Sequence, residues 1–166
     1  MATKLQHTIE FPFGMAAYRK AISDPEYWST LAVGSDKAPG ELESADITDT
    51  GAKIALIQKI PADKLPSAVT SMIPGDLAIH RTVSIEFTSD DRSAGTFDAT
   101  VNGAPATTSG TIEATGSEKC SIAFAGEVTV RIPLIGGKIE KMIAENMRTL
   151  FEAERDFTIA WHDEHP

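Results

Sequence analysis

The sequence predicts an α+β fold in which a curved antiparallel sheet wraps around one long C-terminal helix. Three observations predict it. Most of the chain between residues 41 and 132 alternates apolar and polar side chains, as half-buried strands do. Hairpin turn signals separate these segments, which indicates mainly antiparallel pairing. The one long helical pattern, Ile135 to Trp161, follows the last strand, so a single helix has to cover the buried face of the sheet.

The N-terminal part of the chain predicts one strand and two short helices. The segment from Lys4 to Phe11 alternates and forms the strand. The helices are expected at Met15 to Ile22 and at Pro25 to Leu31, where a proline at the first helical position loses no hydrogen bond. The run from Val33 to Gly40 predicts a loop.

Six further strands follow, mostly in hairpin connection. They are expected at Glu41–Thr48, Ala52–Ile60, Asp76–Thr88, Gly95–Asn102, Thr107–Ala114 and Lys119–Ile132. Asp49-Thr50-Gly51 and Asn102-Gly103 are typical hairpin turns. The segment from Pro61 to Pro74 is bounded by prolines and predicts irregular or briefly helical structure. With the first strand, the sheet has seven strands.

The last helix carries an apolar stripe with one charged interruption. At about 100° per residue, one helix face collects mainly apolar side chains. They are Ile139, Ile143, Met147, Leu150, Phe157 and Trp161. Glu154 falls inside this stripe, although acids are rarely buried. Its carboxylate either reaches water where the helix passes the edge of the sheet, or faces a cavity.

Length and composition bound the class of protein. A chain of 166 residues predicts a single domain, residues 1–166, with an ordered core from Lys4 to Trp161 and a short C-terminal tail. The net charge of −9 argues against nucleic-acid binding and disfavours an anionic membrane surface, although a local basic patch escapes this count. The single cysteine, Cys120, and the lack of an apolar N-terminal segment or membrane-length apolar run predict a cytoplasmic protein without stable membrane insertion.

The order of elements resembles the START-like superfamily, also called SRPBCC or polyketide-cyclase-like. The resemblance covers His7 to Trp161 and rests on this order and on the junction Pro133…Gly136-Gly137…Glu140 before the last helix. Within the superfamily, the chain is similar to an uncharacterised bacterial family of about this length. The resemblance implies the helix-grip fold, with a deep, largely apolar cavity between helix and sheet that binds a hydrophobic small molecule. The superfamily also contains enzymes, so fold alone does not settle function.

Three polar residues share the inward phase of strands with apolar neighbours: His7, Gln58 and Arg81. A buried arginine needs an acidic partner, a ligand anion or an opening to water. We therefore expect Arg81 and Glu154 to face one cavity and to pair in the empty protein, where a ligand carboxylate or hydroxyl could compete for the arginine. The alternative is that the strand phase slips near Pro74 and Arg81 points to solvent.

The residues expected to line the ligand site come from these strands and from the helix stripe. They are His7, Ile9, Phe11, Gln58, Ile79, Arg81, Val83, Phe97, Phe124, Ile143, Met147, Leu150 and Glu154. The two short helices, with Tyr18, Tyr27 and Trp28, and the segment Leu65–Pro74, with Met72, would surround the pocket mouth in this fold.

The sequence favours binding of a lipid, fatty acid or polyketide-like molecule, with no metal and no organic cofactor. The cluster His162-Asp163-Glu164-His165 has metal-ligand residue types but predicts a solvated tail. Two alternatives stay open. One is a cofactor-free cyclase or hydratase in which His7 or Glu154 moves protons. The other is a structural or regulatory domain with a filled core. The sequence does not decide the oligomeric state.

Overall fold

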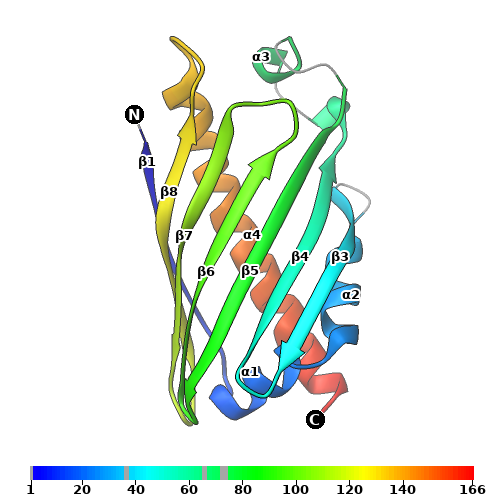
Figure 1. Ribbon diagram of the computed structural model, residues 1–166, viewed down its shortest axis with the longest axis vertical. Coiled ribbons are helices and arrows are strands. Elements are labelled where there is room, and N and C mark those ends of the chain that lie inside the picture. Colours follow the sequence, from blue (N-terminus) through cyan, green and yellow to red (C-terminus); the bar gives the residue numbers. More distant parts are fainter. Residues whose placement is uncertain (1, 36–37, 65–66, 72–74) are drawn as a thin grey trace.

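A curved antiparallel sheet grips one long helix in the computed structural model, which describes residues 2–35, 38–64, 67–71 and 75–166 (Figure 1). The strand order is β1-β8-β7-β6-β5-β4-β3-β2. The strands are β1 Thr3–Glu10, β2 Gly34–Ser35, β3 Ala38–Thr48, β4 Gly51–Ile60, β5 Leu77–Ser89, β6 Arg92–Val101, β7 Ala106–Thr115 and β8 Ser121–Val130. The helices are α1 Met15–Ile22, α2 Pro25–Val33, α3 Ser67–Thr70 and α4 Gly136–Glu164, with a 3₁₀ turn at Ala62–Lys64.

The helix-grip fold and all seven predicted strands are confirmed, and one prediction about a connection is wrong. The run from Val33 to Gly40 is not a simple loop, because the two-residue strand β2 pairs with the start of β3. Gly34 makes this possible. It ends α2 with a φ of 67°, a left-handed value that glycine adopts without strain, and so turns the chain directly into β2.

Helix α4 is rotated relative to the predicted stripe. Its buried face keeps Met147 and Trp161 from that stripe, but its other members after Gly136 each lie one position later than predicted: Glu140, Ala144, Phe151 and Thr158. Ile139, Ile143, Leu150 and Phe157 flank this face and are only partly buried. The sequence pattern misled because the true inner face includes a glutamate, an alanine and a threonine. The partly buried flank leaves an apolar stripe along α4 that the sheet does not fully cover.

The C-terminal tail is more ordered than the sequence predicts. Helix α4 continues to Glu164. The ring of His165 stacks on Trp161 with centroids 3.9 Å apart, and the ring of His162 lies 4.4 Å from that of Phe13. Aromatic contacts thus hold the two histidine rings, while Asp163, Glu164 and His165 are exposed, as expected of a solvated tail. The structure shows no cluster of three or more potential metal ligands among its described residues.

One end of the molecule, which we call the closed end, is sealed by aromatic side chains. Helices α1 and α2 cover the sheet there, beside the C-terminal half of α4 (Figure 1). Tyr27 contacts Trp28 and Trp161 edge-on at 5.0 and 5.7 Å between ring centroids. The indole N–H of Trp28 donates to the carbonyl of Ile22 at 2.8 Å. These side chains are all nearly inaccessible to solvent, so the closed end is a packed core.

The opposite end, the open end, carries the junction between β8 and α4. A buried carboxylate fixes this junction: Glu140 accepts from the backbone N–H of Val130 at 2.9 Å and from the hydroxyl of Thr3 at 2.8 Å. The bond from Val130 holds the pKa of Glu140 below its ordinary value, and the Thr3 hydroxyl acts in the same direction, although burial opposes both. Glu140 therefore ties α4 to β8 and β1.

Candidate functional site

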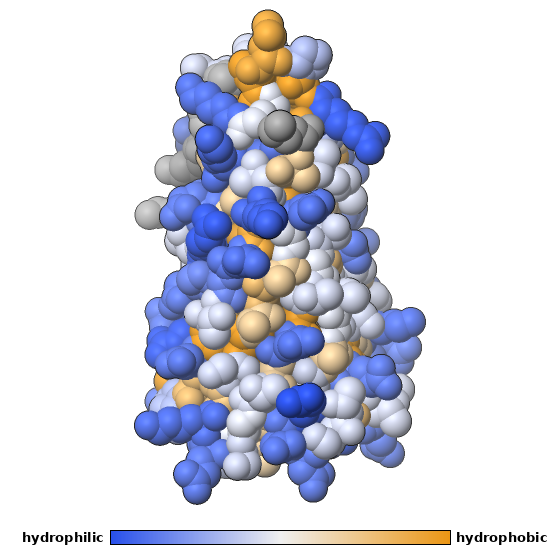
Figure 2. Space-filling model, turned by 90° about the vertical axis from the view of Figure 1, so that its left-hand side faces the viewer, coloured by the Kyte–Doolittle hydropathy of each residue, from blue (hydrophilic) through white to orange (hydrophobic). Residues whose placement is uncertain are grey.

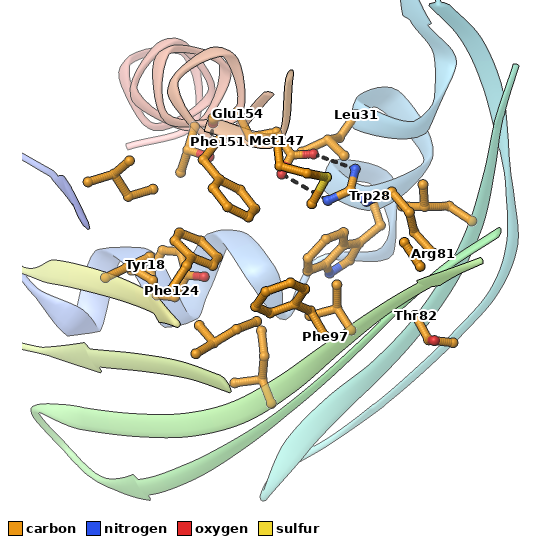
Figure 3. Close-up of a pocket in the computed structure, with 18 of the residues that line it drawn as sticks. Tyr18, Trp28, Leu31, Arg81, Thr82, Phe97, Phe124, Met147, Phe151 and Glu154 are labelled. Atoms are coloured by element: carbon orange, nitrogen blue, oxygen red, sulfur yellow. Dashed lines mark hydrogen bonds and ion pairs between the residues drawn. The ribbon is translucent and has the colours of Figure 1, made fainter. Parts of the chain in front are cut away.

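A small apolar cavity lies between the sheet and α4. Its volume is about 60 Å³, and aromatic rings form much of its wall (Figure 3). Phe97, Phe124 and Phe151 pack against one another, with the rings of Phe124 and Phe151 stacked 3.9 Å apart. A water molecule needs about 10–15 Å³ by this measure, so the cavity has room for a few waters and not for a lipid. As lined by the described residues, the space between sheet and helix is therefore much smaller than the deep cavity that the family resemblance implies.

A second, larger space opens on the outside between α2 and α4. This groove has a volume of about 740 Å³, within the range of about 300–1,000 Å³ that is usual for small-molecule sites. It is lined by Ser29, Thr30, Leu31, Val33, Gly34, Gln58, Leu150, Ala153, Glu154 and Phe157. Leu150 and Phe157 belong to the partly buried flank of α4, so the rotation of the helix supplies the apolar wall of the groove.

The predicted pair of Arg81 and Glu154 is formed. Nη1 of Arg81 donates to Oε2 of Glu154 at 2.9 Å, and Nη2 donates to Oε1 at 3.2 Å, which is the bidentate geometry of a strong pair (Figure 3). Nη1 also donates to Oε1 of Gln58 at 3.2 Å. The side chain of Arg81 is 8% exposed and that of Glu154 is 22% exposed, so the pair is largely shielded from water.

Strand register explains how Gln58 reaches Arg81. Residue 58 on β4 lies opposite Ile79 on β5, two positions before Arg81, so the two polar side chains are diagonal neighbours on the inner face. Glu154 lines both the inner cavity and the outer groove, whereas Arg81 lines the cavity and Gln58 lines the groove. These three residues, which we call the polar triad, therefore stand at the boundary between the two spaces.

Two tyrosines complete the inner cavity. Tyr18 and Tyr27 are buried, and burial raises the pKa of each well above its ordinary value, so both stay neutral phenols. The hydroxyl groups of Tyr27 and Thr158 share a hydrogen bond of 2.7 Å, and Thr158 donates to the carbonyl of Glu154 at 2.6 Å. With Trp28, the tyrosines were expected at a pocket mouth, but all three line the cavity from inside.

The other predicted site residues fall into three groups. Ile9, Phe11, Val83, Phe97, Phe124 and Met147 line the inner cavity, and Leu150 lines the groove. Ile79 and Ile143 are partly buried and line neither space. Leu65, Pro66 and Met72–Pro74 lie outside the described residues. Sequence reasoning missed Phe151 and Thr158, although their spacing of seven residues on α4 carries a helical signal.

His7 and Cys120 do not join the site. The ring of His7 faces α4, where Nε2 lies 2.7 Å from Oε1 of Glu152, and it lines neither space. His7 is therefore not placed to serve as the cavity base that the enzymatic alternative assigned to it. Cys120 is buried, and burial raises the pKa of its thiol to about 11, so the thiol is packed and unreactive.

Comparison with known proteins places the chain in a family. Residues 6–161 match the model of the family described as "Protein of unknown function (DUF2505)". The chain belongs to this family. Uncharacterized proteins of Mycobacterium tuberculosis and Mycobacterium bovis are each 26% identical to it over 152 residues, which are 86% of this chain and 86% of each relative.

Solved structures with the same fold include enzymes. The Zhui aromatase/cyclase from Streptomyces sp. R1128 superposes with a TM-score of 0.62 at 7% identity, over 98% of this chain and 94% of that one. A norcoclaurine synthase mutant from Thalictrum flavum, in complex with a transition state analogue, gives 0.56 at 15% identity over 99% and 96%. A START superfamily protein from Mycobacterium smegmatis gives 0.51 at 9% identity over 92% and 94%. At these identities the likeness establishes the helix-grip fold and nothing beyond it.

Proposed function

We propose that the protein binds a hydrophobic or amphipathic small molecule, such as a lipid, a fatty acid or a polyketide-like compound, in the groove between α2 and α4. The observation that carries the proposal is the polar triad, of which Gln58 and Glu154 line this groove and Arg81 lies behind them. An apolar wall with one fixed polar anchor suits a molecule with an apolar body and one polar end. The fold shared with START-like proteins supports the same class of ligand.

The arrangement of the two spaces suggests how the ligand lies. Its apolar body contacts Leu150 and Phe157, and its polar end reaches the triad through Gln58 and Glu154. The inner cavity is too small for the whole molecule, so entry of an acyl chain or ring into the core requires the pair of Arg81 and Glu154 to separate. The pair thus acts as a gate between groove and cavity.

The geometry favours binding over cyclase- or hydratase-type catalysis. Of the two proposed acid–base residues, His7 lies outside both spaces. Both carboxylate oxygens of Glu154 accept hydrogen bonds from the guanidinium of Arg81, so neither is free to take a proton from a ligand while the pair is formed. A purely structural role predicts that the groove binds nothing, which the following experiment distinguishes.

The test is native mass spectrometry of the purified protein, lipid extraction, and a thermal-shift panel of fatty acids, lipids and polyketides. We expect a co-purifying apolar molecule or a stabilising ligand. Ala153→Trp should fill the groove and abolish the shift, whereas Ala160→Trp, at an exposed alanine of α4 outside the groove, should not. A clean apo mass with no shift across the panel, or unchanged binding by Ala153→Trp, would refute the proposal.

A second pair of variants tests the anchor. Glu154→Gln keeps an acceptor for Arg81 but removes the competing charge, so a fatty acid should bind about tenfold more tightly. A fatty alcohol of the same length should show little change. Arg81→Gln should lose the preference for the acid. If both variants treat the acid and the alcohol alike, the triad does not anchor the ligand.

A further inference from the structure

The junction between β8 and α4 exposes an apolar side chain at the open end of the molecule. The side chain of Leu134 is fully exposed, with a relative accessibility of 105%, and its φ of 73° is the one positive value outside glycine among the described residues. The N–H of Ile135 donates to the carbonyl of Pro133 at 2.9 Å. A three-residue turn with a positive φ at its centre is rare and strained. Strain of this kind persists where the surrounding structure enforces it, and it clusters at functional sites.

The neighbours of Leu134 extend the apolar surface. Pro133 is exposed, and Ile132 and Ile135 are partly exposed. Figure 2 shows a hydrophobic cap at the tip of the molecule, at the end where Figure 1 places this junction, with hydrophilic side chains on both sides of it. Nothing in the packing of α4 against β8 requires a leucine at the apex, since its side chain points to solvent.

The charges around the apex are positive, in contrast to the protein as a whole. Arg131, Lys138 and Lys141 are exposed. Glu140, the one acid between residues 128 and 142, is buried and already bonded to Val130 and Thr3. The net charge of −9 therefore lies elsewhere, and the junction is the local basic patch that a whole-chain count does not show.

We propose that this junction, residues 131–141, docks the open end reversibly onto an anionic membrane surface. The apolar apex suits the interface between headgroups and acyl chains, and the three flanking cations complement anionic headgroups. One leucine and three cations give transient rather than stable attachment. No helix in the described part of the chain is long and apolar enough to cross a membrane. Docking at this end would place the partly covered apolar flank of α4 next to a lipid source.

The test is co-sedimentation of the full chain with vesicles of phosphatidylcholine, alone or mixed with phosphatidylglycerol. We expect binding to the anionic vesicles only, weakened by high salt. Leu134→Gly should weaken it about tenfold while raising the thermal midpoint, because glycine adopts a positive φ without strain. A merely structural leucine would show the second effect without the first. Leu134→Met, which keeps an apolar apex, should bind as the parent protein does.

Charge reversal gives an independent measurement. Lys138→Glu should weaken anionic-vesicle binding at least about fivefold, whereas Lys53→Glu, at an exposed lysine of β4 near the closed end, should not. The proposal is overturned if the parent protein binds no vesicle, or if Leu134→Gly leaves binding unchanged. Concentration-dependent self-association that Leu134→Gly abolishes, without vesicle binding, would instead assign the apex to a second copy of the chain. Ala153→Trp should still bind vesicles, so docking can fail or succeed independently of the groove.

Discussion

The closed end and the open end of the molecule are held together by different interactions. At the closed end, inward-facing strand residues are buried under aromatic side chains; Ile54 and Ile122 are each 1% exposed. At the open end, Ile60, Ile79 and Val101 on β4–β6 are only partly buried. The exception is the β8 side, where Val130 is 5% exposed beneath the Glu140 bonds. One end is sealed by packing, and the other is fastened at one point by a carboxylate.

This difference indicates which part of the molecule can open. Separating the helices from the sheet at the closed end would expose many packed rings at once. The free-energy cost is large, because each Å² of exposed apolar surface costs about 25 cal/mol. Separating β4–β6 from α4 at the open end exposes side chains that water already reaches. The polar triad lies between the two regions, so separation at the open end would give access to the pair of Arg81 and Glu154 without unfolding the aromatic core.

The largest expected effect is at the closed end. Trp161→Ala should lower the free energy of unfolding by about 3–5 kcal/mol, because it removes a buried ring that contacts Tyr27, Phe157 and His165. Ile79→Ala, at the open end, should lower it by only about 1 kcal/mol, since its side chain is already partly exposed. Denaturant titration measures both. Equal losses would contradict the distinction between a packed end and an open one.

The second effect concerns the carboxylate fastening. The pKa of Glu140 is lowered in the folded protein, so its contribution to stability is present above its unfolded pKa of about 4.3 and is lost as pH falls through the folded value. Acid should therefore loosen the open end first. Hydrogen exchange at the Val130 amide should accelerate on acidification, relative to its intrinsic rate, before exchange at Ile122 does. Glu140→Gln keeps an acceptor for the Val130 amide but has no carboxyl group to titrate, so it should remove this pH dependence.

The sequence predicted the fold well because half-buried strands can be recognised by the alternation of apolar and polar residues and by the turn residues between them. All seven strands, both short helices and the terminal helix are present. The rotation of α4 escaped prediction because periodicity ranks side chains by hydrophobicity, whereas Glu140 and Thr158 are buried through hydrogen bonds made by distant residues. Thr3 and Tyr27 lie more than 100 residues away in the chain, and Val130 lies 10 residues away on another element, so none of these bonds gives a signal in the periodicity of the helix.

The site was predicted in part for a related reason. An inward arginine needs a partner, and Glu154 was the acid in the helix stripe, so their pairing followed from electrostatics. The size of the cavity and the location of the groove could not follow, because they depend on how far α2 and α4 stand apart. The prediction for His7 failed for the same reason. Its side chain does face the helix, as predicted, but β1 packs against α4 at this position, so the ring contacts Glu152 and does not reach the cavity.

The smallest expected effect separates the two ends by the direction of their pH response. Tyr27→Phe should lower stability at neutral pH by about 1 kcal/mol, because the hydrogen bond to Thr158 is lost while Thr158 keeps its bond to the carbonyl of Glu154. The raised pKa of Tyr27 means that its contribution is fully present below its unfolded pKa of about 10 and declines as pH rises above that value. The variant should therefore lose less stability in alkali than the parent protein does.

Thermal unfolding at neutral and alkaline pH tests this prediction. Acid should destabilise the variant and the parent protein equally, because the acid-sensitive group, Glu140, lies at the opposite end. An increased acid sensitivity of Tyr27→Phe would show that the two ends do not respond independently.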